Sequence, residues 1–280
     1  VSALTSFDRI MGSMFDVLVL PNIGFIGRPR IPYALVLHDL AFLIEPRWFR
    51  LKARWWHKAV YAKRLIREAT WLFAVSERSK QDAMKLLGVP AERITVIPLG
   101  LSTSSCELQA TSYKLQATPY VLALGASDPR KNIGCAIEAV RLLRQDPRFS
   151  DISLICAGSD VSSFRIQSSS FIISLRRPSD AALADLMKNA AAFLYPSWYE
   201  GYGLPLHEAA RFGTPCIAST SGALPETAPA GTLFAPPFKP HLWTTALKMI
   251  LKDPASHRTA TALSSWDETG RIMAEKIRAY

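Results

Sequence analysis

Short apolar runs recur along the chain, and each is followed by turn residues and then by apolar positions at helical spacing. This alternation is typical of strands and helices in a parallel sheet. The predicted strands are 15–21, 33–39, 70–76, 94–100, 120–125, 152–158, 171–175, 191–197 and 214–219. The clearest helices are 132–145, 179–189, 205–212 and 241–252. The pattern therefore predicts an α/β fold.

A poorly patterned stretch at 101–118 separates two series of strands and predicts a linker. The length of 280 residues also favours two domains over one. We expect two doubly wound, Rossmann-like units, residues 1–103 and 104–262, followed by a last helical segment at 263–280. The first unit has no Gly-rich turn after a first strand, so we expect it to lack its opening strands. Ligands of such sheets bind beyond the carboxyl ends of the strands, and two facing sheets would enclose a cleft.

Composition indicates a globular chain, with 49% hydrophobic and 20% charged residues. No uncharged apolar run reaches about 18 residues, so we expect no membrane-spanning helix. Four cysteines, Cys106, Cys135, Cys156 and Cys216, lie far apart without metal or redox spacing. They are typical of reduced core residues, which predicts a cytoplasmic protein.

Positive charge is concentrated near the amino terminus. The formal net charge is +10, and residues 1–103 hold 15 Lys and Arg against 8 Asp and Glu. Within 45–67, basic residues alternate with the aromatic residues Trp48, Trp55, Trp56 and Tyr61. The segment therefore combines charge with large amphipathic side chains.

Three interpretations of 45–67 remain open. One is an ordinary amphipathic helix with a solvated basic face, because Leu51, Trp55, Ala59, Ala62 and Leu65 have near-helical spacing. Another is contact with an anionic membrane surface, where each nearby basic residue contributes about 1 kcal/mol. The third is nucleic-acid binding, which we do not expect because no recognisable nucleic-acid module accompanies the charge.

The strongest chemical signal lies between Glu200 and Glu208. After a predicted strand, a loop carries Glu200, Gly201 and Gly203, and a helix starts near Leu204. Glycines permit close approach of the backbone to a ligand, and a helix start favours a phosphate. Two carboxylates there make sense as hydrogen-bond acceptors for sugar and ribose hydroxyls. The alternative is that both glutamates are simply solvated or favoured by the helix dipole.

Two further segments place polar residues at the ends of predicted strands. Gly125 closes one strand, and Arg130 and Lys131 follow at a helix entry, where two cations face the end of a strand. Plain surface charge is the alternative. His38 follows the strand 33–39 and is either a packed residue or a functional one. The chain contains no Asp-x-Asp pair, so we expect no metal.

The segment 200–208 resembles the motif of the retaining glycosyltransferases of family 4, a Glu, seven residues and a second Glu around a Gly-aromatic-Gly-Leu-Pro core. The matching positions are Glu200, Gly201, Tyr202, Gly203, Leu204, Pro205 and Glu208. The Arg-Lys-Asn helix entry after Gly125 and the His-Asp-Leu at 38–40 are also similar to that family. The resemblance implies the GT-B architecture, two Rossmann-like domains, with the segment 263–280 packing back towards the first.

The resemblance also implies roles for these residues. Glu200 would face the donor sugar, and Glu208 would bind the ribose. Arg130 and Lys131 would bind the diphosphate, and His38 would lie on the acceptor side. The donor-binding set further includes Gly125, Gly201, Tyr202, Gly203 and Leu204. The donor would be a GDP- or UDP-sugar, with no prosthetic group.

The run from His38 to Phe49 is most like bacterial mannosyltransferases of O-antigen or exopolysaccharide synthesis. This similarity favours mannose as the sugar and a glycan or lipid-linked acceptor at the inner face of the cytoplasmic membrane. The alternative is a non-catalytic nucleotide-sugar-binding or scaffold protein of the same fold. A nucleotide-sugar epimerase or dehydrogenase is disfavoured, because no Gly-x-Gly-x-x-Gly fingerprint follows a first strand.

Overall fold

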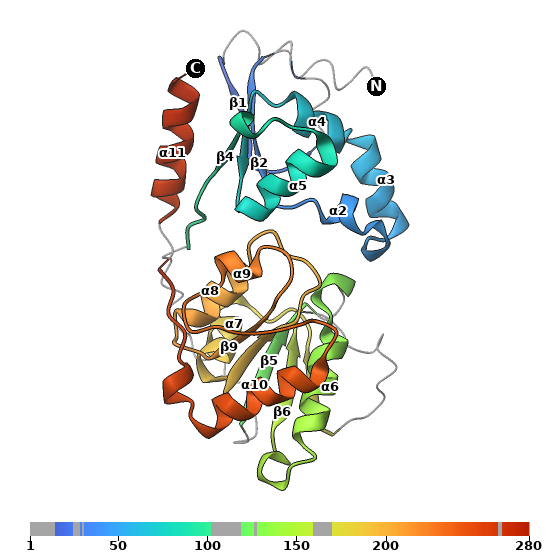
Figure 1. The fold of residues 1–280 in the computed structure, drawn as a ribbon, viewed down its shortest axis with the longest axis vertical. Helices are drawn as coiled ribbons and strands as arrows, with labels where there is room; N and C mark the ends of the chain where they lie inside the picture. Colours follow the sequence, from blue (N-terminus) through green and yellow to red (C-terminus); the bar gives the residue numbers. More distant parts are fainter. Residues whose placement is uncertain are drawn as a thin grey trace. The chain divides into compact units, whose positions relative to one another are not determined.

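The computed structural model describes residues 15–24, 29, 31–101, 119–125, 128–158, 170–262 and 265–279 (Figure 1). The chain divides into two compact units, residues 1–100 with 264–280 and residues 101–263. Each unit contains a parallel sheet with helices, which confirms the predicted α/β class. Most of the predicted linker lies outside the described residues.

The sheet of the first unit has the order β1-β2-β3-β4, and all its neighbouring strands are parallel. Its strands are β1 (Leu18–Leu20), β2 (Tyr33–Leu37), β3 (Trp71–Ala74) and β4 (Ile94–Val96). Every residue of β2 is buried, as expected for a strand covered on both faces. Helix α5 (Glu77–Leu87) follows β3 and is capped by Ser76, whose hydroxyl accepts a hydrogen bond from the amide of Ser79.

The interpretation of 45–67 as one amphipathic helix is wrong. The structure has α2 (Ala41–Ile44), a 3-10 turn at Pro46–Trp48, α3 (Leu51–Ala59) and α4 (Ala62–Glu68). Tyr61 separates α3 from α4 in the left-handed conformation, with φ of 52°. The break allows α4 to bury Leu65 and Ile66 in the core, whereas no residue of α3 is buried.

The sheet of the second unit has the order β10-β9-β8-β5-β6-β7, again with parallel neighbours. Its strands are β5 (Tyr120–Leu124), β6 (Ser153–Ala157), β7 (Ile172–Leu175), β8 (Ala192–Tyr195), β9 (Cys216–Ser219) and β10 (Leu233–Ala235). Strand β10 has no counterpart among the predicted strands. One apolar core lies where α6 and α10 pack against the sheet, and a second includes residues of α7 and α8.

The helices of this unit are α6 (Ile133–Leu143), α7 (Asp180–Asn189), α8 (Leu204–Ala210), α9 (Leu224–Thr227) and α10 (Pro240–Lys252). All four predicted helices are present, with ends within a few residues of those expected. Ser179 caps α7 as predicted, and its hydroxyl accepts a hydrogen bond from the amide of Ala182. Short 3-10 turns occupy Ala91–Arg93, Pro129–Lys131, Pro147–Phe149 and Ala255–His257.

The last helix, α11 (Trp266–Arg278), belongs to the first unit although it follows the second in sequence. The hydroxyl of Thr269 donates a hydrogen bond to the carbonyl of Pro98 over 2.7 Å. The backbone of Gly100 lies against that of Trp266, too close for any side chain at position 100. A hydrogen bond and a glycine contact therefore fix α11 beside the end of β4.

Candidate functional site

The sheet of the second unit has one topological switch point, between β5 and β8. From β5 the chain runs outward through β6 and β7, then returns to β8 on the other side of β5 and continues to β9 and β10. The loops after β5 and β8 therefore leave the carboxyl edge of the sheet in opposite directions. Ligands of open α/β sheets bind at such points. Residues 125 and 128–132 lie after β5, and residues 196–203 lie after β8.

Lys131 and Glu200 meet at this switch point. Nζ of Lys131 lies 2.7 Å from Oε1 of Glu200 and donates a second hydrogen bond, also of 2.7 Å, to the hydroxyl of Tyr195. The two charged side chains are 19% and 13% exposed, so solvent screens their attraction only partly. Burial of Tyr195, together with the charge and hydrogen bond of Glu200, raises the pKa of its phenol well above the ordinary value. Tyr195 is therefore a neutral hydroxyl beside a charged pair.

Arg130 is held by Asp128 on the same turn. The guanidinium donates to both carboxylate oxygens of Asp128, with the shortest contact at 2.8 Å, and the amide of Arg130 bonds the same carboxylate. Burial opposes ionisation of Asp128, but the hydrogen bonds and charge of Arg130 hold its pKa below the ordinary value. Asp128 thus fixes a cation beside the switch point.

Backbone contacts join the two loops that carry these side chains. The amide of Trp198 donates to the carbonyl of Arg130 over 2.8 Å. The side-chain amide of Asn132 donates to the carbonyls of Pro196 and Pro237, at 3.0 and 2.7 Å. The loops after β5 and β8 are therefore held together without the Lys131–Glu200 ion pair.

Glycines make room for this arrangement at two positions. Gly125 has φ of +85°, and a Cβ there would lie 2.7 Å from Cγ of Lys131. Gly222 has φ of +64°, and a Cβ there would lie 2.5 Å from the carbonyl oxygen of Glu200. That carbonyl also accepts a hydrogen bond from the amide of Ala223. Side chains at 125 or 222 would displace Lys131 or Glu200.

Helix α8 presents the remaining predicted donor residues. Gly203 lies at its N-cap with φ of +103°, and a Cβ there would meet a methyl group of Leu224. Glu208 lies in the second turn of α8 and is partly buried. Burial and the charge of Asp180 raise the pKa of Glu208, although Arg211 opposes the shift. Glu208 is therefore a carboxyl group whose ionised form is disfavoured in the folded chain.

A buried histidine, His207, links α8 to Thr227 and Thr261. Nε2 of His207 lies 2.6 Å from the carbonyl of Thr227, and Nδ1 lies 2.8 Å from the hydroxyl of Thr261. A carbonyl only accepts, so Nε2 carries the proton and Nδ1 accepts from Thr261. Burial lowers the pKa of His207, against the hydrogen bond to Thr227. The ring of Tyr202 stacks on the imidazole, with centroids 5.5 Å apart.

His38 belongs to the first unit, where it follows β2 at the carboxyl edge of that sheet. Its side chain is exposed, and Nε2 donates to the carbonyl of Pro21 over 2.9 Å. Its own carbonyl accepts from the hydroxyl of Ser79. The hydrogen bond fixes the imidazole beside the end of β1.

The structure therefore brings Gly125, Lys131 and Glu200 into contact, with Arg130 on the same loop. Sequence reasoning missed Asp128, Tyr195, Gly222 and His207. The Asp-Pro-Arg order signals the Asp128–Arg130 pair, because a capping aspartate before proline starts a tight turn. Nothing local signals Tyr195 or Gly222, which reach the site through the order of the strands.

The described part of the chain holds no group of three or more His, Cys, Asp or Glu side chains placed to bind a metal ion. None of the helices formed by the described residues combines the length and apolar character needed to cross a bilayer.

Comparison with known proteins finds glycosyl transferases along most of the chain. Residues 109–264 match the profile of "Glycosyl transferases group 1", and residues 11–105 match "Glycosyltransferase Family 4". O-antigen chain mannosyltransferase B of Escherichia coli is 28% identical over 87% of this chain and 68% of its own length. An MMP alpha-(1->4)-mannosyltransferase of Mycolicibacterium hassiacum is 30% identical over 64% of this chain and 44% of its own length.

A solved structure also resembles the whole chain. The crystal structure of Anabaena Alr3699/HepE in complex with UDP and glucose has a TM-score of 0.77 and 18% identity, covering 100% of this chain and 82% of that one. This likeness confirms the GT-B fold implied by the sequence motifs. The group 1 profile covers more than half of the chain, including the loops after β5 and β8 and helix α8. The chain belongs to the group 1 glycosyl transferases, as the resemblance of residues 200–208 to family 4 had implied.

Proposed function

We propose that the chain transfers a hexose from a nucleoside diphosphate sugar to a hydroxyl of a glycan or lipid-linked acceptor, with retention at the anomeric carbon. The observation that carries the proposal is the Lys131–Glu200 pair at the switch point between β5 and β8. An ammonium group and a carboxylate side by side suit a ligand with an anionic diphosphate next to a hydroxyl-rich sugar. The family membership supports the same reaction.

Each site residue then has a role in donor binding. Lys131 and Arg130 bind the diphosphate and offset the charge that develops on it as it leaves. Glu200 accepts hydrogen bonds from the sugar, and Glu208 accepts them from the ribose. The backbone from Gly201 to Leu204, including Tyr202 and Gly203, lies along the donor. Gly125 leaves space for Lys131.

Glu200 is an acceptor for hydroxyls in this scheme and not a nucleophile, so we favour front-side transfer over the two-carboxylate route of retaining glycosidases. The bond between the anomeric carbon and the diphosphate oxygen breaks. The acceptor oxygen bonds to the same face of that carbon, and its proton passes to the departing phosphate. The cations bind this transition state better than the ground state, which is the source of acceleration. The reaction needs no metal, because Arg130 and Lys131 supply the positive charge.

Mannose is the favoured sugar. Both mannosyltransferase relatives carry that sugar in their names, whereas the solved neighbour contains UDP and glucose. We propose a GDP- or UDP-sugar as the donor. The acceptor binds at the first unit, where His38 positions it, and residues 45–67 contact an anionic membrane surface at the cytoplasmic face.

The test is transfer from GDP-mannose and from UDP-glucose, with the product followed by proton NMR at the anomeric position. We expect an α-linked product from an α-linked donor, in the presence of a metal chelator. Glu200→Ala should lower turnover about 100-fold or more, and Glu226→Ala, an exposed carboxylate of the same unit, is the control. An inverted product would refute retention, and nucleotide-sugar binding without turnover would support a scaffold protein instead.

A further inference from the structure

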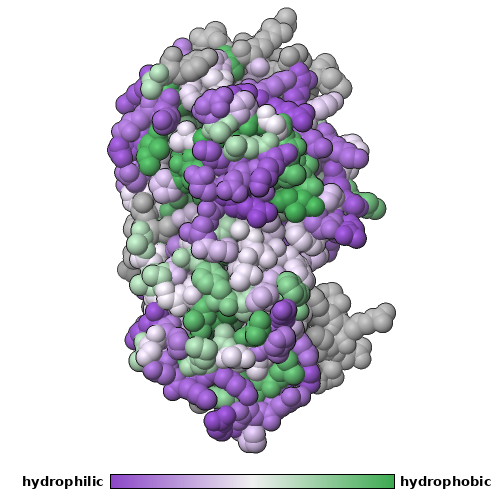
Figure 2. Space-filling model, in the orientation of Figure 1, coloured by the Kyte–Doolittle hydropathy of each residue, from purple (hydrophilic) through white to green (hydrophobic). Residues whose placement is uncertain are grey.

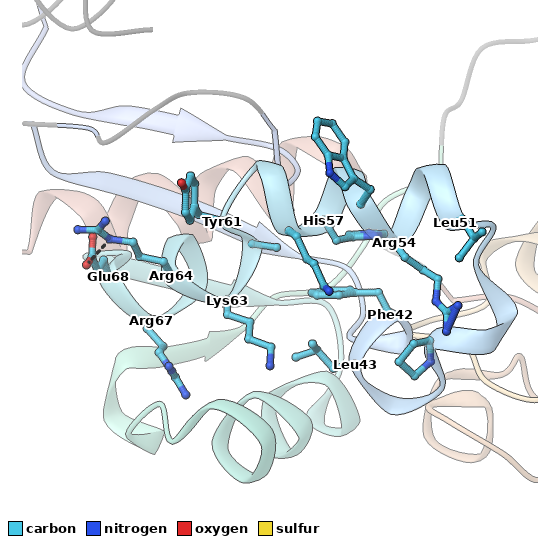
Figure 3. A pocket seen from close by; sticks show the side chains of 14 residues that line it. Phe42, Leu43, Leu51, Arg54, His57, Tyr61, Lys63, Arg64, Arg67 and Glu68 are labelled. Atoms are coloured by element: carbon cyan, nitrogen blue, oxygen red, sulfur yellow. Dashed lines mark hydrogen bonds and ion pairs between the residues drawn. The ribbon is translucent and has the colours of Figure 1, made fainter. Parts of the chain in front are cut away.

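A cavity of about 1000 Å³ lies in the first unit, apart from the donor site (Figure 3). Its walls come from α2, α3, α4 and the 3-10 turn between α2 and α3. The lining residues are Phe42, Leu43, Pro46, Leu51, Arg54, Trp55, His57, Lys58, Tyr61, Ala62, Lys63, Arg64, Arg67 and Glu68. This volume is at the upper end of the usual range for small-molecule sites, about 300–1,000 Å³.

The apolar part of the lining extends beyond the hydrophobic core, since Phe42 and Leu43 pack against the core but other large apolar side chains do not. Leu51 and Trp55 on α3 are 78% and 70% exposed, and Tyr61 between α3 and α4 is 68% exposed. The ring of Phe42 stacks on the imidazole of His57, with centroids 4.4 Å apart. Large apolar side chains grouped around a hollow mark an interaction site more often than isolated ones do. Figure 2 shows hydrophobic residues among strongly hydrophilic ones on the visible face of the first unit.

The charged part of the lining is strongly basic. Five of the fourteen lining residues are basic, namely Arg54, Lys58, Lys63, Arg64 and Arg67. Glu68 is the only carboxylate among these described lining residues, and it is paired with Arg64 over 2.8 Å. Arg67 donates to the carbonyl of Leu87. The cavity therefore carries an excess of positive charge next to apolar side chains.

We propose that this cavity binds one molecule of a phosphate-bearing amphiphile, such as a membrane lipid. The anionic headgroup contacts the basic side chains of α3 and α4, and part of an apolar chain packs against Phe42, Leu43 and Trp55. Figure 3 shows Phe42 and Leu43 in the middle of the view, with Arg54, Lys63 and Arg67 around them. The proposal concerns a site in the first unit and stands without the transfer reaction.

The combination of a hollow and an apolar lining distinguishes this site from simple adsorption to a membrane. Adsorption requires only basic residues on a face, and each contributes similarly wherever it lies on that face. Binding in a cavity predicts that substituting a lining residue weakens affinity more than substituting a neighbouring residue outside the cavity. Lys52 provides the comparison, because it is exposed on α3 but does not line the cavity.

The first experiment is titration of the intact chain with hexyl, octyl and decyl phosphate below their micellar concentrations, with inorganic phosphate and decyl maltoside as controls. We expect affinity to rise up to roughly fourfold per added methylene and to level off once the cavity is filled. Inorganic phosphate and the neutral maltoside should each bind far more weakly. Equal affinity for all chain lengths, or for inorganic phosphate, would overturn the proposal.

The second experiment compares substitutions inside and outside the cavity. Lys63→Gln should weaken decyl phosphate binding about tenfold, and Trp55→Ser should flatten the dependence on chain length. Their controls, Lys52→Gln and Leu86→Ser, replace exposed residues of the same unit outside the cavity. These controls should retain wild-type binding.

Adsorption to a surface predicts a different outcome, with similar losses of about fivefold for Lys52→Gln and Lys63→Gln. Nucleic-acid binding predicts that a single-stranded oligonucleotide binds and displaces decyl phosphate. Either result contradicts the proposal. Thermal unfolding and GDP binding of each variant show that a lost affinity does not come from a lost fold, because the exposed positions 52, 55 and 63 add little to the core.

Discussion

Nζ of Lys131 lies 2.7 Å from Oε1 of Glu200, although 69 positions separate the two residues in sequence. The ion pair joins the loop after β5 to the loop after β8, across the switch point of the sheet. The cation proposed for the diphosphate and the carboxylate proposed for the sugar thus hold each other in the ligand-free chain. A donor that binds as proposed would replace one contact with several, so that neither group would become an unpaired charge.

Asp128→Asn should raise the KM for the donor about tenfold, with a smaller effect on kcat. The change removes the ion pair that holds the Arg130 guanidinium, and leaves the local turn able to form. Initial rates of transfer at several donor concentrations measure the effect.

The chain contains a matched control for this substitution. Asp146-Pro147-Arg148 repeats the same turn, with Asp146 capping the 3-10 turn and pairing with Arg148 over 2.6 Å. Asp146→Asn should therefore leave the donor KM unchanged. Equal effects of the two substitutions would show that Asp128 acts only on the stability of its turn.

Gly125→Ala should lower both activity and stability. Its Cβ would lie 2.7 Å from the Lys131 side chain, and its positive φ disfavours alanine by about 1 kcal/mol. Chemical unfolding and donor turnover provide the two readouts. Gly134→Ala is the control, since nothing lies within 4 Å of its Cβ position and helix α6 should gain about 0.5–1 kcal/mol of stability. A Gly125→Ala variant with unchanged turnover would contradict the role of Lys131.

Glu208→Gln should stabilise the ligand-free chain at neutral pH while weakening donor binding. Burial and the charge of Asp180 raise the pKa of Glu208, so the folded chain holds this proton more tightly than the unfolded chain does. The stability of the wild type therefore falls as pH rises from the ordinary carboxyl pKa through the raised one. Glutamine removes this dependence, and the variant's advantage should grow between pH 4 and pH 7. Thermal unfolding across this range would contradict the assignment if the difference stayed constant.

His207 should make the second unit sensitive to acid. Burial lowers the pKa of the imidazole, so the unfolded chain binds the proton more readily. Stability is then lost as pH falls below the unfolded value of about 6.5 towards the lowered one. Histidine NMR titration should place the midpoint of His207 below the ordinary histidine value of about 6.5. A midpoint at or above that value would refute the neutral imidazole with two hydrogen bonds.

The sequence predicted most of the sheets because their strands are continuous apolar runs. Strands β2 and β8 are buried along their whole length, and the pattern marks them clearly. Strand β10 escaped prediction because it is only three residues long and ends in a Pro-rich segment. The break at Tyr61 also escaped, because its left-handed conformation depends on the packing of α4 against the core.

The candidate site was predictable as a set of residues but not as a geometry. The spacing of Glu200 and Glu208 is visible in the sequence, since both lie in one loop and helix. The contact of Lys131 with Glu200 depends on β5 and β8 being neighbours, which the apolar pattern does not specify. The cavity beside α3 is lined partly by exposed side chains, including Leu51 and Trp55. The helical spacing of these two residues predicts instead that they lie on a buried face.

The most direct test of the donor site is calorimetric titration of GDP and UDP into the wild type, Lys131→Ala and Lys188→Ala. Lys188 is an exposed lysine of the same unit on α7, and it should be dispensable. We predict that one nucleotide binds the wild type and Lys188→Ala equally, and Lys131→Ala about 10- to 100-fold more weakly. Unchanged affinity in Lys131→Ala would contradict the assignment of the loops after β5 and β8 as the nucleotide-sugar site.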